Sequence, residues 1–478
     1  MDEKKFAWNF LEKNKKKLAD LSDKIWLLAE VGMQEYKSSE TLIDYLADND
    51  FEIEKGVAKM PTAFVAKYGK GKPVIGIDAE YDALPEISND TVPYRKPLVD
   101  GGPGHGCGHN VFGVGSSGAA VALAKTMEEF NIKGTVKLFG CPAEEMCIGK
   151  AYMARGGVYD GTDAVLTWHP SARNTVSYSP SNAYDSVRFV FKGISSHGNQ
   201  PWNGRDALAA VEMMDQMMNV MRGYFQHNTT MNRAILDSSK FATVLSNRAE
   251  VWYVFRNPSR EYANVLRDYV YKAAQGASNL TECPVEIQFI TGVYPRLPNE
   301  YLAKLQYSNL ESVGPPKFTD KEKEFAAKLQ ETYPSHMGYV GGGQAIGVFL
   351  DETLTPPRGH RFGDYMGTSD EGDVSWVAPL VSLGTACHPI GCPGHSWQKV
   401  AAVGTTIAHK GLLVASKTIA ATGIGLLLEP EHLKKARSEF DERRAGRIYK
   451  SVIPPEIDPI LDWHKEYQDE YRGKMKEK

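Results

Sequence analysis

Hydrophobic and polar positions in the first 170 residues predict alternating helices and strands. Leu18, Leu21 and Ile25 share one face of an amphipathic helix, and later apolar runs end in acidic or imidazole side chains. The expected elements are a helix at 10–32, strands within 62–86, a helix at 113–130, and strands at 134–145 and 163–170. This alternation predicts an α/β fold, in which helices flank a mostly parallel sheet.

The pattern changes near residue 184 and changes back near residue 300. Between these points the sequence predicts a strand at 185–197, a helix at 205–224, a strand at 249–256, a helix at 260–277 and a strand at 284–290. Such an order is typical of an inserted α+β domain. We therefore expect one domain at 1–183 and 300–478, interrupted by a second at 184–299. A long helix should close the first domain, followed by a charged, proline-containing tail on the surface.

Composition favours a soluble protein over a membrane or nucleic-acid-binding protein. The 478 residues suit two domains, and a net charge of −4 argues against nucleic acid as the main partner. The apolar stretch 404–428 contains His409, Lys410 and Lys417, so no membrane span is expected. The acidic start has no apolar signal segment, and six cysteines fit a reduced protein, so the expected location is cytoplasmic.

The stretch DGGPGHGCGHNVFGVG at 100–115 has three interpretations. It could cradle a phosphate, form a glycine turn that happens to hold a thiol, or provide one end of a metal site. The phosphate interpretation is weak, because neither of the common glycine-rich phosphate motifs is present. On an extended segment, Cys107 and His109 would point to the same side, as two metal ligands could.

Residues elsewhere in the chain favour the metal interpretation. Asp82, the pair Glu144–Glu145 and His169 all follow predicted strands, where the chemistry of α/β sheets is concentrated. Together with His395, they offer the thiolate, imidazole and carboxylate ligands that suit Zn or Mn. Most of the 12 histidines should nevertheless have ordinary structural roles. The segment VGGGQ at 340–344 is most simply a flexible turn.

Five motifs in order resemble the M20 metallopeptidase and amidohydrolase family, in its aminoacylase-like branch. They are GHGCGHN, GCPAEE, LTWHP, SDEGDVSW and GHSWQ, and the resemblance extends from about residue 20 to 425. It implies a catalytic α/β domain interrupted by a ferredoxin-like lid that forms a homodimer, and it leaves open a related second subunit. It further implies a metal-dependent amidohydrolase that cleaves the amide bond of an N-acyl or N-aroyl amino acid.

The resemblance assigns a role to each candidate residue. Glu144 is the general base, Asp82 orients a metal ligand with Glu80 beside it, and His197 of the lid reaches the partner subunit's site to stabilise the oxyanion. Two divalent ions, Zn or Mn, would be held by Cys107, His109, Glu145, His169 and His395.

The substrate-binding part of the resemblance contains one departure. Arg256 matches a lid arginine that can hold a substrate carboxylate. Relatives have PNVV ahead of this strand, whereas this chain has FATVLSN, which puts Thr243 in the place of the family's asparagine. Asn247 lies four residues further on. The chain should therefore bind the substrate carboxylate next to the scissile bond more weakly or in a different way.

Two alternative functions remain open at this point. The same two-metal site could serve a dipeptidase or a hydrolase that removes an amino group from an aromatic ring. A different class is a catalytically silent subunit that only binds a ligand or partner. The presence of Glu144 and all five ligands argues against a catalytically silent subunit, because a subunit that only binds needs no general base.

Overall fold

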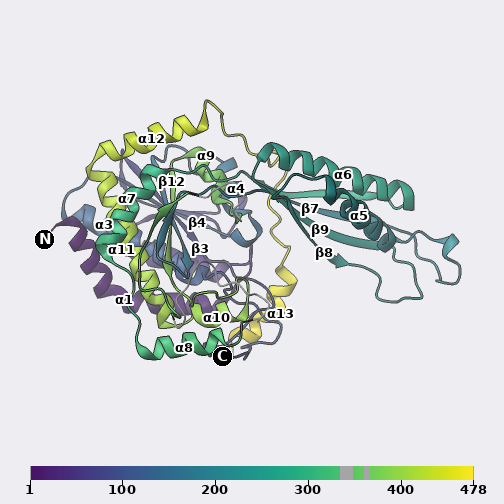
Figure 1. The fold of residues 1–478 in the computed structure, drawn as a ribbon, viewed down its shortest axis with the longest axis horizontal. Helices are drawn as coiled ribbons and strands as arrows, with labels where there is room; N and C mark the ends of the chain where they lie inside the picture. Colours follow the sequence, from purple (N-terminus) through teal and green to yellow (C-terminus); the bar gives the residue numbers. More distant parts are fainter. Residues whose placement is uncertain (1, 334–347, 360–366, 477–478) are drawn as a thin grey trace.

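The computed structural model describes residues 2–333, 348–359 and 367–476. The segment VGGGQ at 340–344 lies outside the described residues. Figure 1 shows a larger part, built from a sheet with helices around it, and a smaller part that projects to one side. Both kinds of architecture agree with the fold class predicted from the sequence.

Eight strands among the described residues form the large sheet, in the order β1-β2-β4-β3-β5-β12-β6-β11. They are β1 (Glu52–Lys55), β2 (Phe64–Lys70), β3 (Val74–Glu80), β4 (Gly134–Cys141), β5 (Ala164–Ser171), β6 (Thr175–Ser177), β11 (Thr355–Arg358) and β12 (Leu380–Ala386). The central neighbours β4, β3, β5 and β12 run parallel, while β1, β2 and β6 join by antiparallel pairing. The parallel centre aligns the carboxyl ends of three strands that the sequence analysis singled out.

Alternate side chains of the central strands enter two different cores. In β5, Leu166 and Trp168 pack with one cluster of buried residues, and Val165 packs with the other. The helices around the sheet are α1 (Glu3–Leu28), α2 (Tyr36–Ala47), α3 (His109–Glu129), α4 (Gly149–Arg155), α7 (Glu300–Val313), α8 (Asp320–Gln330), α9 (Glu371–Val377), α10 (Trp397–Val403) and α11 (Thr406–Leu428). A strand covered on both faces explains the nearly continuous apolar runs in the sequence.

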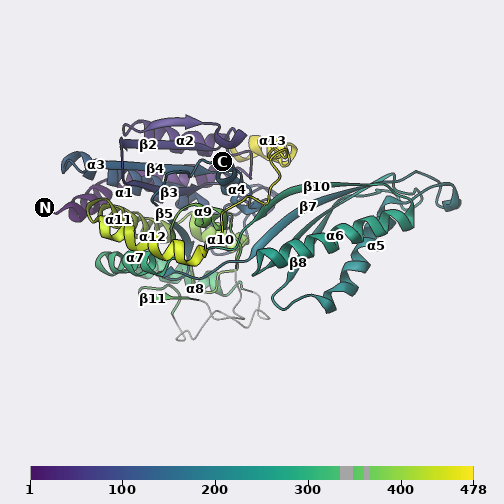
Figure 2. The ribbon, with the colours of Figure 1, turned by 90° about the horizontal axis from the view of Figure 1, so that it is seen from above.

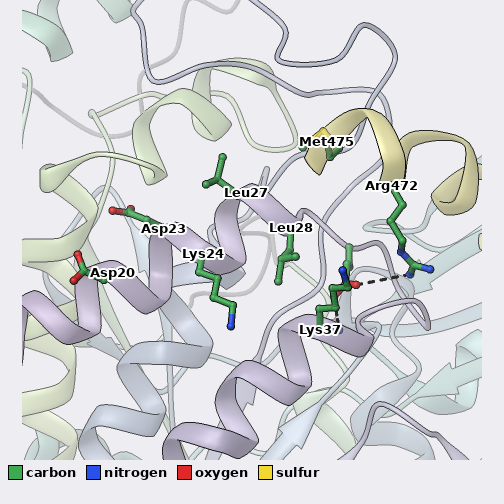
Figure 3. Close-up of a pocket in the computed structure, with 9 residues that line it drawn as sticks. Asp20, Asp23, Lys24, Leu27, Leu28, Lys37, Arg472 and Met475 are labelled. Atoms are coloured by element: carbon green, nitrogen blue, oxygen red, sulfur yellow. Dashed lines mark hydrogen bonds and ion pairs between the residues drawn. The ribbon is translucent and has the colours of Figure 1, made fainter. Parts of the chain in front are cut away.

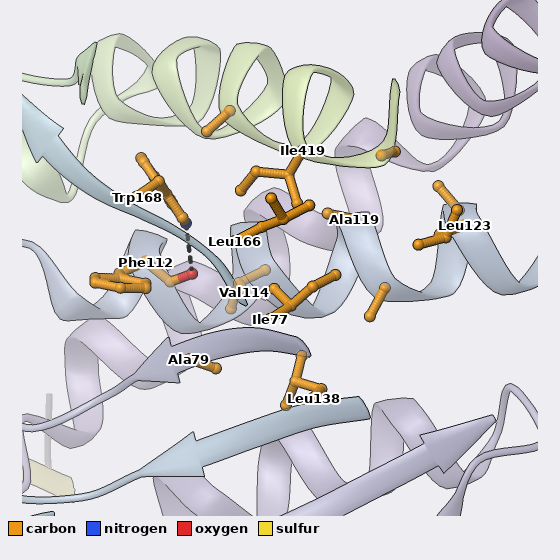
Figure 4. Close-up of a cluster of buried hydrophobic side chains, with 14 of the residues drawn as sticks. Ile77, Ala79, Phe112, Val114, Ala119, Leu123, Leu138, Leu166, Trp168 and Ile419 are labelled. Atoms are coloured by element: carbon orange, nitrogen blue, oxygen red, sulfur yellow. Dashed lines mark hydrogen bonds between the residues drawn. The ribbon is translucent and has the colours of Figure 1, made fainter. Parts of the chain in front are cut away.

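Helix α11 packs in the same core as Leu166 and Trp168, which is called the first core below. It is the one described helix long and apolar enough to cross a membrane, with a mean hydropathy of 1.7 in its most apolar window. However, 83% of that window is buried inside the protein. Figure 4 shows Ile419 of this helix beside Leu166, with Trp168 nearby donating a hydrogen bond of 3.2 Å to the Phe112 carbonyl. The apolar character of α11 is therefore accounted for by core packing.

The smaller part contains a four-stranded antiparallel sheet in the order β10-β7-β9-β8. Its elements are β7 (Ala183–Lys192), α5 (Ala207–Met221), β8 (Thr230–Asp237), β9 (Arg248–Asn257), α6 (Arg260–Thr281) and β10 (Val285–Val293). This βαββαβ order is the ferredoxin-like arrangement, and Figure 2 shows both helices along one side of the sheet. The domain boundaries at 183/184 and 299/300 stay a prediction.

Two local expectations differ from the structure. Strand β8 was not predicted, because it lies at the sheet edge with mostly exposed side chains and so lacks an alternating pattern. The tail was expected to be a surface segment, but it forms α12 (Pro430–Arg444) and α13 (Lys465–Lys476). It packs against the larger part: the buried Gln468 side chain accepts a 2.9 Å hydrogen bond from Val31 N–H, and Phe440 is buried.

Replacement of Leu166 by alanine tests the packing of the first core. We expect a loss of about 2–5 kcal/mol in the free energy of unfolding, because a fully buried leucine leaves a cavity when it is truncated. Urea unfolding followed by tryptophan fluorescence measures the change. As a control, Leu428→Ala at the half-exposed end of α11 should cost less than about 1 kcal/mol. Equal effects of the two substitutions would contradict this core assignment.

Candidate metal centre

The carboxyl ends of β3, β4 and β5 supply most of the candidate residues. Asp82 lies two residues past β3, Glu144 begins a short 3-10 turn past β4, and His169 is near the end of β5. Since these strands are parallel neighbours, their ends meet at one edge of the sheet. The candidates that follow different strands are thus brought together by the sheet itself.

The glycine-rich stretch places Cys107 and His109 by a turn, and the expectation of an extended segment is wrong. Gly108 has φ +83°, and His109 is the first residue of α3. A Cβ atom on Gly108 would lie 3.0 Å from the Cβ atom of Pro170, next to His169. This close approach and the left-handed backbone both require glycine. The turn still brings the thiol and the imidazole to the same site.

Three groups of side chains could each hold a metal ion; one of them, Glu80, His109 and Glu144, includes the candidate base, and the other two overlap at Cys107. Of these two, the first contains Cys107, His109 and His169, and the second contains Cys107, Glu145 and His395. Within each group, the potential ligand atoms all lie within 4.8 Å of one another. Cys107 belongs to both overlapping groups, so its sulfur lies where a ligand shared by two ions would lie. The five predicted ligands are therefore gathered in one place.

Hydrogen bonds orient the imidazole rings of His109 and His169. Nδ1 of His109 lies 2.7 Å from the Asp82 carboxylate, and Nδ1 of His169 lies 2.9 Å from the Pro170 carbonyl oxygen. Both rings thus use Nδ1 as the donor and keep Nε2 as the available ligand atom. Asp82 also accepts a 2.9 Å hydrogen bond from the Glu145 N–H. Its predicted role as an orienting residue agrees with this geometry.

The chemistry of the donor set fits divalent metal ions. Among the described residues, the buried atom Glu145 Oε1 makes no hydrogen bond. Burial would raise the pKa of the Cys107 thiol, but hydrogen bonds with His109, His169 and His395 lower that pKa well below its usual value. A thiolate surrounded by imidazoles and a carboxylate is a donor set typical of Zn and related metals.

A buried ion-pair network lies beside the two groups, and the sequence analysis missed its central residue. The Lys150 ammonium is fully buried, 2.7 Å from Glu80 and 2.5 Å from Asp370. Burial would lower the pKa of Lys150, but Asp370 and Glu80 raise it well above its ordinary value. The other Glu80 oxygen lies 3.1 Å from His109 Nε2. Lys150 thus compensates carboxylates that crowd one side of the centre.

A cavity of about 620 Å³ opens onto the metal-binding groups and Glu144. The smaller part of the structure, 183–293, is called the lid below, and its Arg256 also lines the cavity. The guanidinium carbon of Arg256 lies 5.1 Å from the centroid of the Tyr184 ring, and the side chain donates a hydrogen bond of 3.2 Å to Asn232. Two further lining residues that the sequence analysis missed, Arg296 and Glu371, form an ion pair. Glu144, four of the five predicted ligands and Arg256 therefore share one cavity.

His197 and Thr243 do not line this cavity. Both are exposed and lie beside each other at the far end of the lid, where Gly198 N–H donates a 2.8 Å hydrogen bond to the Thr243 carbonyl. Strand β7 separates them from the cavity, because Tyr184 near its start lines the cavity and Lys192 ends it. Eight residues of strand span about 26 Å. Within one subunit, these two residues are therefore away from the metal centre.

A second cavity, of about 430 Å³, lies between α1, α2 and α13 (Figure 3). Aliphatic side chains and the ion pair of Arg472 with Glu30, at 3.7 Å, account for much of its lining. No candidate metal-binding group among the described residues includes any residue of this cavity. It therefore lies at the docking site of the tail and is separate from the metal centre.

The comparison with protein-family models identifies the family. Residues 76–361 match the model of peptidase family M20/M25/M40. The chain belongs to this family. The M20 chain is therefore a metal-dependent hydrolase, as its sequence motifs predicted.

Relatives of this M20 chain cover nearly its whole length. It is 34% identical to one subunit of the p-aminobenzoyl-glutamate hydrolase of Escherichia coli, over 95% of this chain and 98% of the relative. It is 26% identical to the Xaa-Arg dipeptidase of Mus musculus, over 91% and 92% of the two chains. The fold resembles that of a dinuclear metal-binding M20 peptidase of Bacillus subtilis, with a TM-score of 0.54 at 18% identity, over 87% and 99% of the two chains.

Metal analysis of purified variants tests the two ligand groups. We expect about two divalent ions per native chain. His109→Ala and His169→Ala should each lower the metal content, because each removes an oriented imidazole from the first group. His197→Ala is the matched control and should retain the native content, since His197 lies far from both groups. Plasma mass spectrometry after equilibration with Zn or Mn gives the readout, and full occupancy of both first variants would contradict the assignment.

Proposed function

We propose that this M20 chain hydrolyses the amide bond of an N-acyl or N-aroyl amino acid. The observation that carries this proposal is the presence of Glu144, both ligand groups and Arg256 around one cavity. The E. coli relative is named as a subunit of a p-aminobenzoyl-glutamate hydrolase, and this name supports the same substrate class. The dipeptidase relative makes a dipeptide the second candidate, since its scissile bond is also an amide.

Glu144 and Arg256 each have a defined task in this reaction. When bound, two ions of Zn or Mn would supply Lewis acidity and make a water molecule acidic enough to attack near neutral pH. Glu144 accepts a proton from the attacking water and passes it to the leaving amine. Arg256 binds the carboxylate of the substrate through its planar guanidinium and so fixes the scissile bond beside Glu144.

The ligand roles follow from the same arrangement. Cys107, His109, Glu145, His169 and His395 would hold the ions. Asp82 keeps His109 in the tautomer that leaves Nε2 free. Release of free amine from a panel of N-acyl amino acids and dipeptides, with Zn and with Mn, tests substrate class and metal together. A catalytically silent subunit would release none.

We further propose that the chain works as a homodimer formed through the lid. Strand β8 is the edge of the lid sheet, with the apolar side chain of Ile235 exposed. The adjoining loop exposes Phe241 by 74% and also exposes Val244, which pairs with His197. An exposed apolar edge strand is a ready surface for pairing with a second copy. Pairing of two lids would bring His197 and Thr243 of one subunit toward the cavity of the other.

The proposed location is the cytoplasm, and the proposed partners include a related second subunit. All six cysteines are free, which suits a reducing compartment. Cys107 must also stay reduced to bind a metal. The E. coli relative is, by its name, one subunit of a hydrolase, which supports testing a heteromeric assembly beside the homodimer.

Substitution of the adjacent acids separates chemistry from metal binding. In Glu144→Gln, metal content should remain while kcat falls by about 10² to 10⁴, the usual contribution of general base catalysis. In Glu145→Gln, metal content itself should fall, because a ligand oxygen has become an amide. Metal analysis and steady-state kinetics on the same samples give both readouts. If the two variants exchange these behaviours, the proposed roles are reversed.

Subunit mixing tests whether His197 acts across a dimer. Glu144→Gln and His197→Ala should each be nearly inactive alone. A mixed dimer contains one site with both residues intact, so an equimolar exchanged mixture should recover up to about one quarter of native activity. Native mass spectrometry verifies that subunits have exchanged. Exchange without recovery would contradict action of His197 in the partner's site.

A further inference from the structure

The ion pair between Arg296 and Glu371 has no part in the reaction proposed above. Arg296 follows β10, and Glu371 begins α9, so the two residues come from segments 75 residues apart. Their side chains retain 15% and 10% exposure respectively, and both line the cavity of the metal centre. A substrate in this cavity would therefore meet a cation and an anion held together.

Arg256 differs from Arg296 in its charge balance. Among the described residues, Arg256 has no carboxylate partner, and its contacts are the Asn232 amide and the Tyr184 ring. Lys150 already pairs with Glu80 and Asp370 on the metal side. Within the described part of the cavity wall, Arg256 is thus the arginine that can compensate one substrate carboxylate. The Arg296–Glu371 pair adds no net charge.

The sheet register places Arg256 near the end of β10, from which the chain continues to Arg296. Tyr184 of β7 is paired with Arg256 of β9 on one side and with Val293 of β10 on the other. Two strand spacings separate Arg256 from Val293, which is about 10 Å. Arg296 follows three residues later, and its N–H donates a 2.9 Å hydrogen bond to Ser181 Oγ. Arg256, Arg296 and Glu371 all line one cavity, so a single substrate bound there can contact both features.

We propose that Glu371 determines substrate specificity by selecting a neutral carboxamide side chain, as in an N-acyl glutamine, over the carboxylate of an N-acyl glutamate. This inference rests on the proposed amidohydrolase function. The substrate's α-carboxylate binds Arg256, and its side chain meets the ion pair. A carboxamide accepts a hydrogen bond from Arg296 and donates one to Glu371. A carboxylate there would be repelled by Glu371, and such like-charge contacts are costly inside a cavity.

Kinetics of the native holoenzyme give the first test. The substrates are p-aminobenzoyl-glutamine and p-aminobenzoyl-glutamate, which have almost the same shape and differ in charge. We expect kcat/KM to favour the glutamine compound by at least about tenfold. A preference for the glutamate compound, or equal rates, would overturn the inference. This test needs no variant and so does not depend on any substitution being tolerated.

Substitutions then assign the preference to the ion pair. Glu371→Gln frees Arg296 for a substrate carboxylate and should shift the glutamate-to-glutamine ratio of kcat/KM upward by at least about tenfold. The double variant Glu371→Gln with Arg296→Gln should lose this gain. Glu311→Gln, on the exposed surface of α7, removes the same charge outside the cavity and should leave the ratio at its native value.

The outcomes separate this inference from the proposed function. If the native enzyme releases no amine from either compound or from the wider N-acyl panel, the proposed function fails. If it cleaves both compounds but the ratio in Glu371→Gln equals that of Glu311→Gln, only the role of Glu371 fails. Metal content of each variant, measured on the same sample, shows that the centre is intact.

Discussion

The carboxylate of Asp82 connects the two Cys107-containing groups of the candidate metal centre. One oxygen binds the His109 ring at 2.7 Å, and the other accepts the Glu145 N–H at 2.9 Å. Asp82 is buried, so both contacts are needed to compensate for its removal from water. The start of α3, the end of β3 and the turn after β4 are thereby fixed together. The positions of both ligand groups depend on this connection, because it orients a ligand of each.

Most of the cationic side chains in and beside the cavity have an acidic partner. Lys150 partly compensates two buried carboxylates beside the candidate metal centre, and Arg296 pairs with Glu371. Arg256 alone among these cations has no acidic partner within the described residues. Because buried charges are stable only when compensated, this division identifies which groups maintain the fold and which remain available to a ligand. It also limits how much negative charge a well-bound ligand can carry.

The lid strands connect two different sets of residues. At one end, Tyr184 and Arg256 line the cavity; at the other, His197 and Thr243 form an exposed tip. A strand cannot fold back to bring its ends together, so one subunit uses the near set and presents the far set to solvent. The exposure of His197 and Thr243 and their distance from the cavity are consequences of the same geometry.

The sequence by itself determined the fold class and the candidate residues that follow strands, because parallel strands place their carboxyl ends at one edge. Its motifs also pointed to all five members of the two candidate groups, whose role as metal ligands stays a prediction. Only the tertiary structure decided that Gly108 turns the chain into α3, that Lys150 compensates Glu80, and that Arg296 pairs with Glu371. These features depend on contacts between segments far apart in the chain. Such contacts leave no periodic pattern, since each partner alone is an ordinary charged or small residue until packing brings the segments together.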